Sequence, residues 1–345
     1  MSDEILSLIY NFAKKFSDPV SNLAFKPENK NITAIINNGN VNLSLTISGK
    51  NNTAYEDISR LLRKNIEQIP GVLSTNIVLT SEIDVKNINE KKFKINAKNI
   101  IAVASGKGGV GKSTFSVNLS AALKLIGMNV GLLDADIYGP SIPRMIGYNK
   151  KPEINSEKKL IPIEKYGIKC MSIGFILEEE APTIWRGPMI MKALEQMFNG
   201  VEWGSLDYLI IDLPPGTGDA QLTLAQSSKL SGSIIISTPQ DVALADARKG
   251  FNMFKKVNVD ILGMIENMSY FICDNCDKKH FIFSKDGAEK EAGRLQIPFL
   301  GKIPIDKRLR EQSDKGKPAC IDEIDSEISK KFIEIAKSLN VILDD

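Results

Sequence analysis

The chain contains Val103-Ala-Ser-Gly-Lys-Gly-Gly-Val-Gly-Lys-Ser-Thr114, a stretch rich in glycine and lysine. The apolar run 100–104 predicts a buried strand, and the apolar spacing over 113–125 predicts a helix. A strand, a glycine-rich loop and a helix in this order form a phosphate-binding loop, because backbone N–H groups at the positive end of the helix face phosphate oxygens. The stretch therefore predicts a P-loop nucleotide-binding domain.

The two lysines of this loop have different expected roles. Lys112 supplies positive charge to the outer phosphates, and the Ser113 hydroxyl ligates Mg²⁺. Lys107 is not needed to hold the chain's own nucleotide, but it resembles the extra lysine of the MinD/ParA/nitrogenase-iron-protein class. That resemblance implies a lysine that crosses a dimer interface and acts in trans like an arginine finger. The residues expected to bind ATP in this loop are Gly106, Lys107, Gly108, Gly109, Val110, Gly111, Lys112, Ser113 and Thr114.

Three aspartates follow two predicted strands, 129–133 and 208–212. Ligands of open parallel sheets bind at the carboxyl ends of the strands, where these side chains fall. Asp212 has the Walker B pattern and is expected to hold Mg²⁺, with Asp134 in the same shell. Asp136 is expected to position the attacking water, so the catalytic residues predicted are Lys107, Lys112 and Asp136.

Strands alternate with helices from residue 99 onward, which predicts an α/β fold with a doubly wound, mostly parallel sheet. The strands expected in this part are 100–104, 129–133, 168–173, 208–212, 234–238, 261–266 and 298–301. The domains predicted are a small α+β domain over 1–82, a linker over 83–98 and the ATPase domain over 99–345.

The small domain is predicted to have the order α-β-β-α-β. Apolar spacing indicates a first helix over 5–16, and alternation indicates strands over 32–36 and 41–47 around a turn. A capping box at Thr53-x-x-Glu56 begins the second helix, and a last strand follows over 73–80.

Composition excludes several classes of protein. The 345 residues are 43% apolar and carry a net charge of +2, so neither a nucleic-acid footprint nor an acidic tail is present. No apolar run is long enough to span a bilayer, and the start of the chain lacks the basic residues of a signal peptide. We expect a cytoplasmic protein with no membrane or nucleic-acid partner.

Cys273 and Cys276 form a Cys-x₂-Cys pair, which is half of a metal site. Their spacing alone allows structural zinc, an iron–sulfur cluster, redox chemistry or inert thiols. His280 would be a third zinc ligand, with Cys320 or Cys170 as a remote fourth. If Lys107 implies a face-to-face dimer, two copies of the pair supply four thiolates to one [4Fe–4S] cluster on the twofold axis.

The chain resembles the Mrp/ApbC family of P-loop ATPases that carry iron–sulfur clusters. The phosphate loop identifies only the wider class, and the more specific stretches lie between residues 134 and 276. They are Asp134-Ala-Asp-Ile-Tyr-Gly-Pro-Ser-Ile-Pro143, Trp185-Arg-Gly-Pro-Met189, Asp212-Leu-Pro-Pro-Gly-Thr-Gly-Asp219 and Glu266-Asn-Met-Ser-Tyr-Phe-Ile-Cys-Asp-Asn-Cys276.

The resemblance implies a homodimer that binds ATP, hydrolyses it slowly, accepts a [4Fe–4S] cluster from an assembly scaffold and passes it to apo iron–sulfur proteins. It also implies that Asn267 contacts adenine and that Pro304 lines the base pocket. The first eighty residues resemble the small domain that often precedes this ATPase, but Thr46–Thr53 replaces its cysteine-containing stretch.

Two other interpretations remain open from the sequence. A MinD/ParA-like positioning ATPase has the same phosphate loop but no need for the cysteine pair. A zinc-stabilised ATPase switch uses the pair without any cluster.

Overall fold

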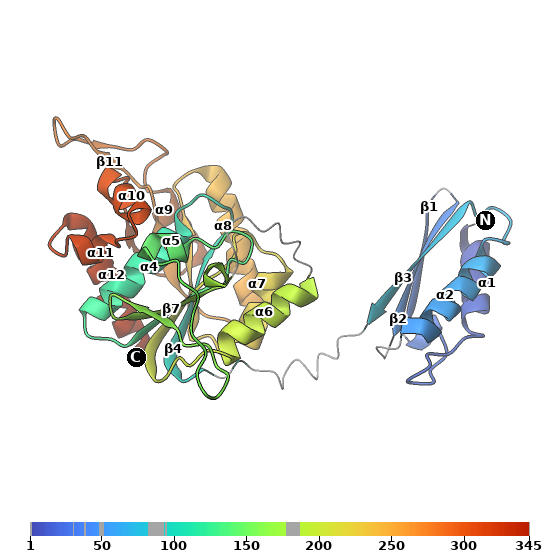
Figure 1. Ribbon diagram of the computed structural model, residues 1–345. Helices are drawn as coiled ribbons and strands as arrows, with labels where there is room; N and C mark the ends of the chain where they lie inside the picture. The colour runs from blue at the N-terminus through green and yellow to red at the C-terminus, as the bar shows by residue number, and fades with distance from the viewer. Residues whose placement is uncertain are drawn as a thin grey trace. The chain divides into compact units, whose positions relative to one another are not determined.

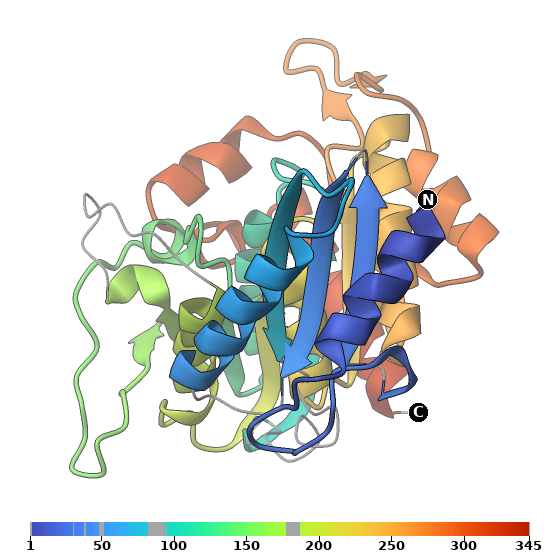
Figure 2. The same cartoon turned by 90° about the vertical axis from the view of Figure 1, so that its right-hand side faces the viewer.

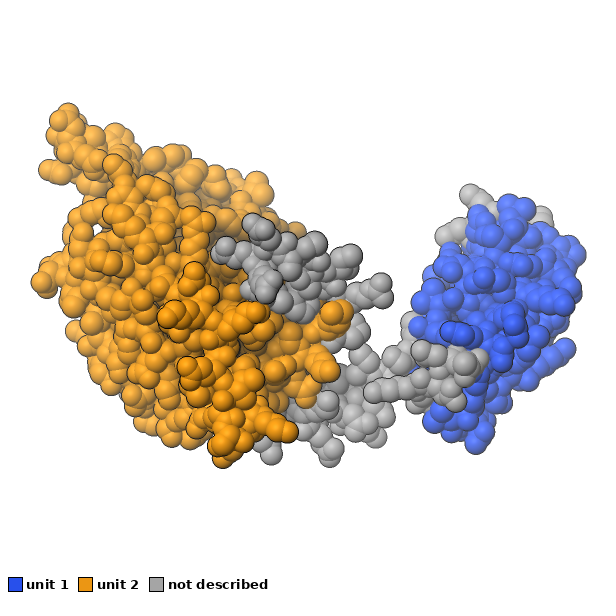
Figure 3. Space-filling view, in the orientation of Figure 1, with its two compact units in different colours: residues 1–91 blue, residues 92–345 orange. Residues whose placement is uncertain are grey.

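The chain divides into two compact units, Met1–Lys91 and Lys92–Asp345 (Figure 3). The computed structural model describes residues 2–29, 31–37, 39–47, 52–81, 93, 95–176 and 187–344. Most of the predicted linker 83–98 lies outside these residues, as do positions 48–51 of the Thr46–Thr53 stretch. Each unit has its own apolar core, so each is described separately.

The first unit has the predicted α-β-β-α-β order. Its elements are α1 (Ser2–Ala13), the short 3₁₀ helix η1 (Pro27–Asn29), β1 (Ile32–Asn37), β2 (Asn40–Ile47), α2 (Asn52–Ile66) and β3 (Ser74–Ser81). β2 lies in the middle of the sheet, antiparallel to β1 and parallel to β3. Both long helices cover one face of this sheet (Figures 1 and 2). The first helix ends three residues earlier than the apolar spacing predicts.

A buried hydrogen-bond cluster joins the loop after α1 to α2. The Asp18 carboxylate accepts hydrogen bonds from the backbone N–H of Val20 and Ser21 at 2.9 and 2.8 Å. It also accepts one from the Tyr55 hydroxyl at 2.9 Å. Asp18 and Tyr55 are both 1% exposed, so the three bonds satisfy a carboxylate that is shielded from water.

The second unit is built on one eight-stranded sheet of order β13-β10-β9-β4-β8-β5-β7-β6. All neighbouring pairs are parallel except β6 with β7. This confirms the predicted fold class, and β6 is an antiparallel edge strand that the sequence does not predict. The strands are β4 (Ala97–Ser105), β5 (Val130–Asp134), β6 (Ile163–Lys165), β7 (Ile168–Ser172), β8 (Leu206–Asp212), β9 (Gly232–Ser237), β10 (Ile261–Glu266) and β13 (Phe299–Lys302).

Helices cover both faces of this sheet (Figure 1). One face carries α4 (Lys112–Leu125), α11 (Ala319–Asp322) and α12 (Glu327–Asp344), with α5 (Ile142–Ile146) and α10 (Lys307–Asp314) beside them. The other carries α6 (Gly187–Asn199), α7 (Asp219–Ser227), α8 (Asp241–Lys256) and α9 (Gly287–Leu295), and η2 (Ile173–Phe175) follows β7. The central strands are buried on both faces, which is why they read as continuous apolar runs. Among the described helices, none combines the length and the apolar character that crossing a membrane requires.

A separate hairpin projects from the second unit. It consists of β11 (Phe271–Ile272) and β12 (Lys279–His280), which pair antiparallel (Figure 1). We call residues 267–287, from the end of β10 to the start of α9, the cysteine arm. The sequence did not predict the two short strands of this arm.

Candidate functional site

The phosphate loop connects β4 to α4, as its sequence predicts. Gly109 and Gly111 have φ angles of +79° and +83°, a left-handed conformation that a side chain disfavours. Gly106 lies so close to the backbone of Asp246 in α8 that a Cβ there would collide with it. The phosphate loop and α8 therefore contact each other backbone to backbone at this point.

Asp212, at the end of β8, joins three side chains of the P-loop helix. Its carboxylate accepts hydrogen bonds from the hydroxyls of Ser113 and Ser116 at 2.5 and 2.7 Å. Lys112 Nζ lies 2.8 Å from the same carboxylate, with 6% of the lysine side chain and none of the aspartate exposed. The sequence did not predict a role for Ser116. Its position one helical turn after Lys112 places it on the same side of α4 as that lysine, which could have indicated a contact with Asp212.

Asp134 lies beside Asp212 because β5 and β8 pair in parallel with these two residues in register. Its carboxylate accepts hydrogen bonds from the Ser172 hydroxyl at 2.9 Å and from the Ile142 N–H at 3.3 Å. Burial, together with the nearby negative charge of Asp212, raises the pKa of Asp134 to about 7.

The donor set at this edge of the sheet fits Mg²⁺. Asp134 and Asp212 are both fully buried, and Lys112 forms an ion pair with Asp212. The raised pKa of Asp134 reflects its burial and the negative charge of Asp212, and a divalent cation bound here would favour the ionised form of both carboxylates. Carboxylate and hydroxyl oxygens, here with Ser113, are the ligands that Mg²⁺ prefers.

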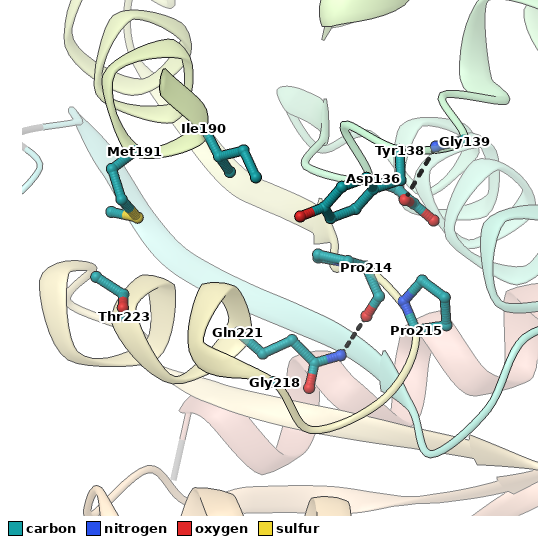
Figure 4. Close-up of a pocket in the computed structure, with 10 residues that line it drawn as sticks. All are labelled: Asp136, Tyr138, Gly139, Ile190, Met191, Pro214, Pro215, Gly218, Gln221 and Thr223. Atoms are coloured by element: carbon teal, nitrogen blue, oxygen red, sulfur yellow. Dashed lines mark hydrogen bonds between the residues drawn. The ribbon is translucent and has the colours of Figure 1, made fainter. Parts of the chain in front are cut away.

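Asp136 faces a cavity of about 630 Å³ (Figure 4). Its Oδ1 accepts a hydrogen bond from the Gly139 N–H at 3.3 Å, and partial burial raises the pKa of the carboxyl. Ile190 and Met191 project into the cavity from α6, and Gln221 and Thr223 come from α7. The cavity is lined by Asp136, Tyr138, Gly139, Ile190, Met191, Pro214, Pro215, Gly218, Gln221 and Thr223.

The loop after Asp212 is tied to the strand that leads into the phosphate loop. The Leu213 N–H donates to the Val103 carbonyl at 3.1 Å, and the Gly216 N–H donates to the Ser105 carbonyl at 3.0 Å. Gln221 donates through Nε2 to the Pro214 carbonyl. The loop therefore lies between the phosphate loop and the cavity that Asp136 faces.

Lys107 is half-buried, and its carbonyl accepts a hydrogen bond from the Ser105 hydroxyl at 2.9 Å. Within the described part of the chain, no ion pair holds its side chain. The role in trans that the sequence suggests stays a prediction.

The cysteine arm brings Cys273, Cys276 and His280 together, with one ligand atom of each within 4.8 Å of the others. Cys273 is half-buried and Cys276 is exposed. Hydrogen bonds from the backbone N–H groups of Asn275 and Cys276 lower the pKa of the Cys273 thiol, which favours the thiolate that binds metal.

The remote fourth ligand suggested by the sequence is wrong. Cys170 lies in β7 and Cys320 in α11, and both are fully buried in the main core. Burial raises the pKa of each thiol to about 12, so these cysteines stay protonated. Neither joins the group formed by Cys273, Cys276 and His280.

Glu266 holds both ends of the cysteine arm, a role that the sequence did not reveal. Its side chain is fully buried at the end of β10. One carboxylate oxygen accepts a hydrogen bond from the Ser269 hydroxyl, where the arm begins. The other accepts one from the Ala288 N–H at 2.8 Å, where the arm ends.

Asn267 connects this arm to the phosphate loop. Its Nδ2 donates to the Val110 carbonyl at 2.7 Å, and the side chain is 7% exposed. A Cβ at Gly111 would collide with the same nitrogen, so the glycine is required for this close approach. Asn267 was predicted to contact adenine, and the structure places it directly against the loop that would hold the phosphates.

Pro304 is buried and lines a groove of about 500 Å³ that also includes Cys273. The groove therefore lies beside the cysteine arm, and a role for Pro304 in a base pocket stays a prediction. Trp185 and Arg186 of the Trp-Arg-Gly-Pro stretch lie outside the described residues.

Several known proteins are similar to this chain over most of its length. The chain is 53% identical over 243 residues to the "iron-sulfur protein required for NADH dehydrogenase, mitochondrial" of Arabidopsis thaliana, a match that covers 70% of this chain and 78% of the relative. It is 51% identical over 249 residues to the iron-sulfur cluster carrier protein of Aquifex aeolicus, covering 72% of this chain and 68% of the relative. A nucleotide-binding protein from Archaeoglobus fulgidus, solved with ADP and with cobalt found in it, superimposes with a TM-score of 0.60 at 39% identity. That match covers 72% of this chain and 96% of the solved one.

The family assignment rests on most of the second unit. Residues 96–340 match the ParA-type family described as NUBPL iron-transfer P-loop NTPases, and this range includes the phosphate loop, the strand-end aspartates and the cysteine arm. The chain therefore belongs to the NUBPL-type family of iron-transfer P-loop NTPases.

Proposed function

We propose that this chain is an ATP-dependent carrier that holds a [4Fe–4S] cluster as cargo between two copies of itself and passes it to apo-proteins. The observation that carries the proposal is a pair of thiols outside the core, the half-buried Cys273 and the exposed Cys276, on a hairpin that projects from a P-loop domain. A [4Fe–4S] cluster takes four cysteine ligands, and one chain offers two outside its core. A twofold axis through the hairpin would bring the second pair.

Two further features support a second copy as the partner in this site. Phe281, Ile282 and Phe283 follow His280 directly, and 38%, 59% and 37% of their surfaces are exposed. Consecutive exposed apolar side chains beside metal ligands are typical of a surface that becomes buried. Lys107, which forms no ion pair within the described residues, is available to reach the nucleotide of the other subunit.

The nucleotide half of the proposal assigns each loop residue a role. The backbone from Gly106 to Thr114 holds the phosphates of ATP, and Lys112 neutralises their charge. Mg²⁺ would be held by Ser113, Asp212 and Asp134 and would supply further positive charge to the phosphates. Asp136 positions the attacking water, and hydrolysis is slow. The adenine is proposed to lie against Asn267.

The names of the relatives support iron–sulfur proteins as partners, since they are called cluster carriers and an iron–sulfur protein required for NADH dehydrogenase. We propose that the chain receives its cluster from an assembly scaffold and delivers it to apo iron–sulfur proteins. Exposed thiols persist in a reducing compartment such as the cytoplasm, which is where we expect this transfer. A positioning ATPase of the MinD/ParA type has no need for the cysteine pair, so that function does not explain these two residues.

Anaerobic reconstitution with iron and sulfide tests the proposal. We expect the full chain to take up one [4Fe–4S] cluster per two chains, with equal amounts of iron and sulfide by chemical analysis. Cys273→Ser should abolish the cluster because one thiolate is lost from each chain. Cys320→Ala is the matched control, since it removes a thiol that is buried in the core and leaves Cys273 and Cys276 intact.

Two results would overturn this function. One is a tightly bound zinc ion in place of iron and sulfide after reconstitution, which is the outcome that a zinc-stabilised switch predicts. The other is a full cluster on a chain that sedimentation shows to be strictly monomeric.

A further inference from the structure

The single histidine of this 345-residue chain lies at the cysteine pair. Cys273 and Cys276 follow β11, whereas His280 lies in β12 on the return strand of the hairpin, opposite Phe271. One ligand atom from each of the three side chains lies within 4.8 Å of the other two. Ligands about 2.3 Å from a tetrahedral ion lie about 3.8 Å apart, so side-chain movements of about 1 Å would place all three around one ion.

Backbone hydrogen bonds of the hairpin bring the three ligand residues together. The Cys273 N–H donates to the Lys278 carbonyl at 3.0 Å, and the Asp277 N–H donates to the Cys273 carbonyl at 2.9 Å. Asp277 has a φ angle of +55°, which turns the chain back toward β12. The three ligands are therefore set by a closed turn between two paired strands.

Ring contacts at the base of the hairpin hold its two strands against each other. The rings of Tyr270 and Phe281 lie 6.3 Å apart, edge to face. Lys279 Nζ lies 4.8 Å from the centre of the Tyr270 ring. Both contacts join residues that flank the ligands, so they limit how far His280 can move from the cysteines.

We propose that one chain, without a second copy, binds a single divalent transition-metal ion through Cys273, Cys276 and His280 and leaves a fourth position open. Two sulfurs and one imidazole select zinc, ferrous iron or cobalt over magnesium and calcium. An open fourth position on an exposed hairpin makes the ion exchangeable. This site is distinct from the cluster between two copies, although it uses the same cysteines.

The shared [4Fe–4S] cluster and the single metal ion differ in whether they need His280 as a ligand. A cluster shared by two chains has four cysteine ligands and does not need His280. A single ion in one chain has two cysteines and loses a third of its protein ligands if the imidazole is removed. Substitution of His280 therefore separates this proposal from the function proposed above.

Titration of the metal-free full chain with Co²⁺ under anaerobic conditions tests the site. We expect one ion per chain, a sulfur-to-cobalt charge-transfer band and the strong visible absorption of tetrahedral cobalt. His280→Ala should weaken the visible bands and lower the affinity by at least about tenfold, because the loss of a ligand costs no less than the loss of a group that orients one. His280→Cys should restore the affinity.

Lys278→Ala is the matched control. It alters an exposed neighbour in the same turn, and the backbone carbonyl that accepts the Cys273 N–H remains. Circular dichroism checks that each variant keeps its fold. We expect His280→Ala to form the iron–sulfur cluster as well as the unsubstituted chain does.

Either of two results would overturn the proposal. The first is an equal cobalt affinity and spectrum in His280→Ala and the unsubstituted chain, which would exclude the imidazole from the site. The second is one cobalt ion per two chains with a four-sulfur spectrum, which would show that the ion bridges two copies. Failure of cluster reconstitution alone leaves this site intact and contradicts only the carrier function.

Discussion

The buried carboxylate of Glu266 makes a sharp prediction, because one side chain holds both ends of the cysteine arm. It accepts hydrogen bonds from the Ser269 hydroxyl and, at 2.8 Å, from the Ala288 N–H. Glu266→Gln keeps the shape of the side chain but turns one of the two acceptor oxygens into an NH₂ group. The amide oxygen can still accept from the Ala288 N–H, and the NH₂ group can donate to the Ser269 hydroxyl, which rotates to accept it. Both hydrogen bonds therefore remain, but both lose the charged acceptor.

The expected magnitude follows from these two contacts. A hydrogen bond to a charged group contributes about 1.5–3 kcal/mol and a neutral one about 0.5–1.5 kcal/mol, so weakening both bonds should lower the free energy of unfolding of the second unit by about 2 kcal/mol. A domain of this size loses about 2–4 °C of melting temperature per kcal/mol, which gives a fall of about 4–8 °C. The backbone amides of residues 269–287 should also exchange with deuterium faster than in the unsubstituted chain, because both ends of the arm are loosened.

Calorimetry and hydrogen exchange of the full chain measure these effects, with Glu289→Gln as the matched control. Glu289 lies one residue beyond Ala288, is half exposed and pairs with Lys302 at 2.5 Å. A pair of this kind contributes about 0–1 kcal/mol, so the control should shift the midpoint by no more than about 4 °C and leave exchange in the arm unchanged. An unchanged midpoint together with unchanged exchange in Glu266→Gln would refute the reasoning, since the carboxylate would then hold neither end.

Four further substitutions probe the rest of the molecule. Lys112→Ala should abolish ATP binding measured by calorimetry, whereas Lys107→Ala should preserve binding and impair hydrolysis; an equal loss of affinity in both would contradict the role of Lys107 in trans. Gly111→Ala should lower the free energy of unfolding of the nucleotide-free protein by at least about 1–2 kcal/mol, because alanine is strained at φ +83° and its Cβ would displace the Asn267 side chain. An unchanged melting temperature would argue against that contact. Tyr55→Phe should lower the free energy of unfolding of the first unit by about 1.5–3 kcal/mol, because the Asp18 carboxylate loses the buried hydroxyl that donates to it at 2.9 Å. A change confined to the unfolding of the second unit would contradict this.

The sequence predicted the parts of the site that local pattern determines. A glycine-rich loop needs a strand before it and a helix after it, so Lys112 and Ser113 were placed by their neighbours in the chain. Asp134 and Asp212 were placed because each ends an apolar run, and parallel strands bring such ends to one edge of a sheet. The structure puts these two aspartates in register on neighbouring strands.

Contacts between distant segments were not predictable in this way. Asn267 and Val110 are 157 positions apart in the sequence. Their hydrogen bond depends on the strand order of the sheet, in which β9 lies between β10 and β4, the strand that leads into the phosphate loop. Glu266 reads in the sequence only as the charged end of a strand, and nothing nearby shows that it folds back on Ala288. The antiparallel edge strand β6 was missed because its three residues are too short for alternation to be recognised.

These distant contacts give the two halves of the site a direct physical connection. The Val110 carbonyl belongs to the loop that would hold the phosphates. It accepts a hydrogen bond from the side-chain amide of Asn267, and Asn267 is the first residue of the cysteine arm. Asn267 is followed by Met268, whose φ angle of +53° allows little adjustment, and preceded by Glu266, whose carboxylate is fixed at both ends of the arm. A displacement of the Val110 carbonyl must therefore either break the hydrogen bond to Asn267 or move the base of the arm that carries the cysteines. The same geometry works in reverse, since closing two arms around a shared metal centre constrains Asn267 and, through it, the loop on which ATP is expected to lie.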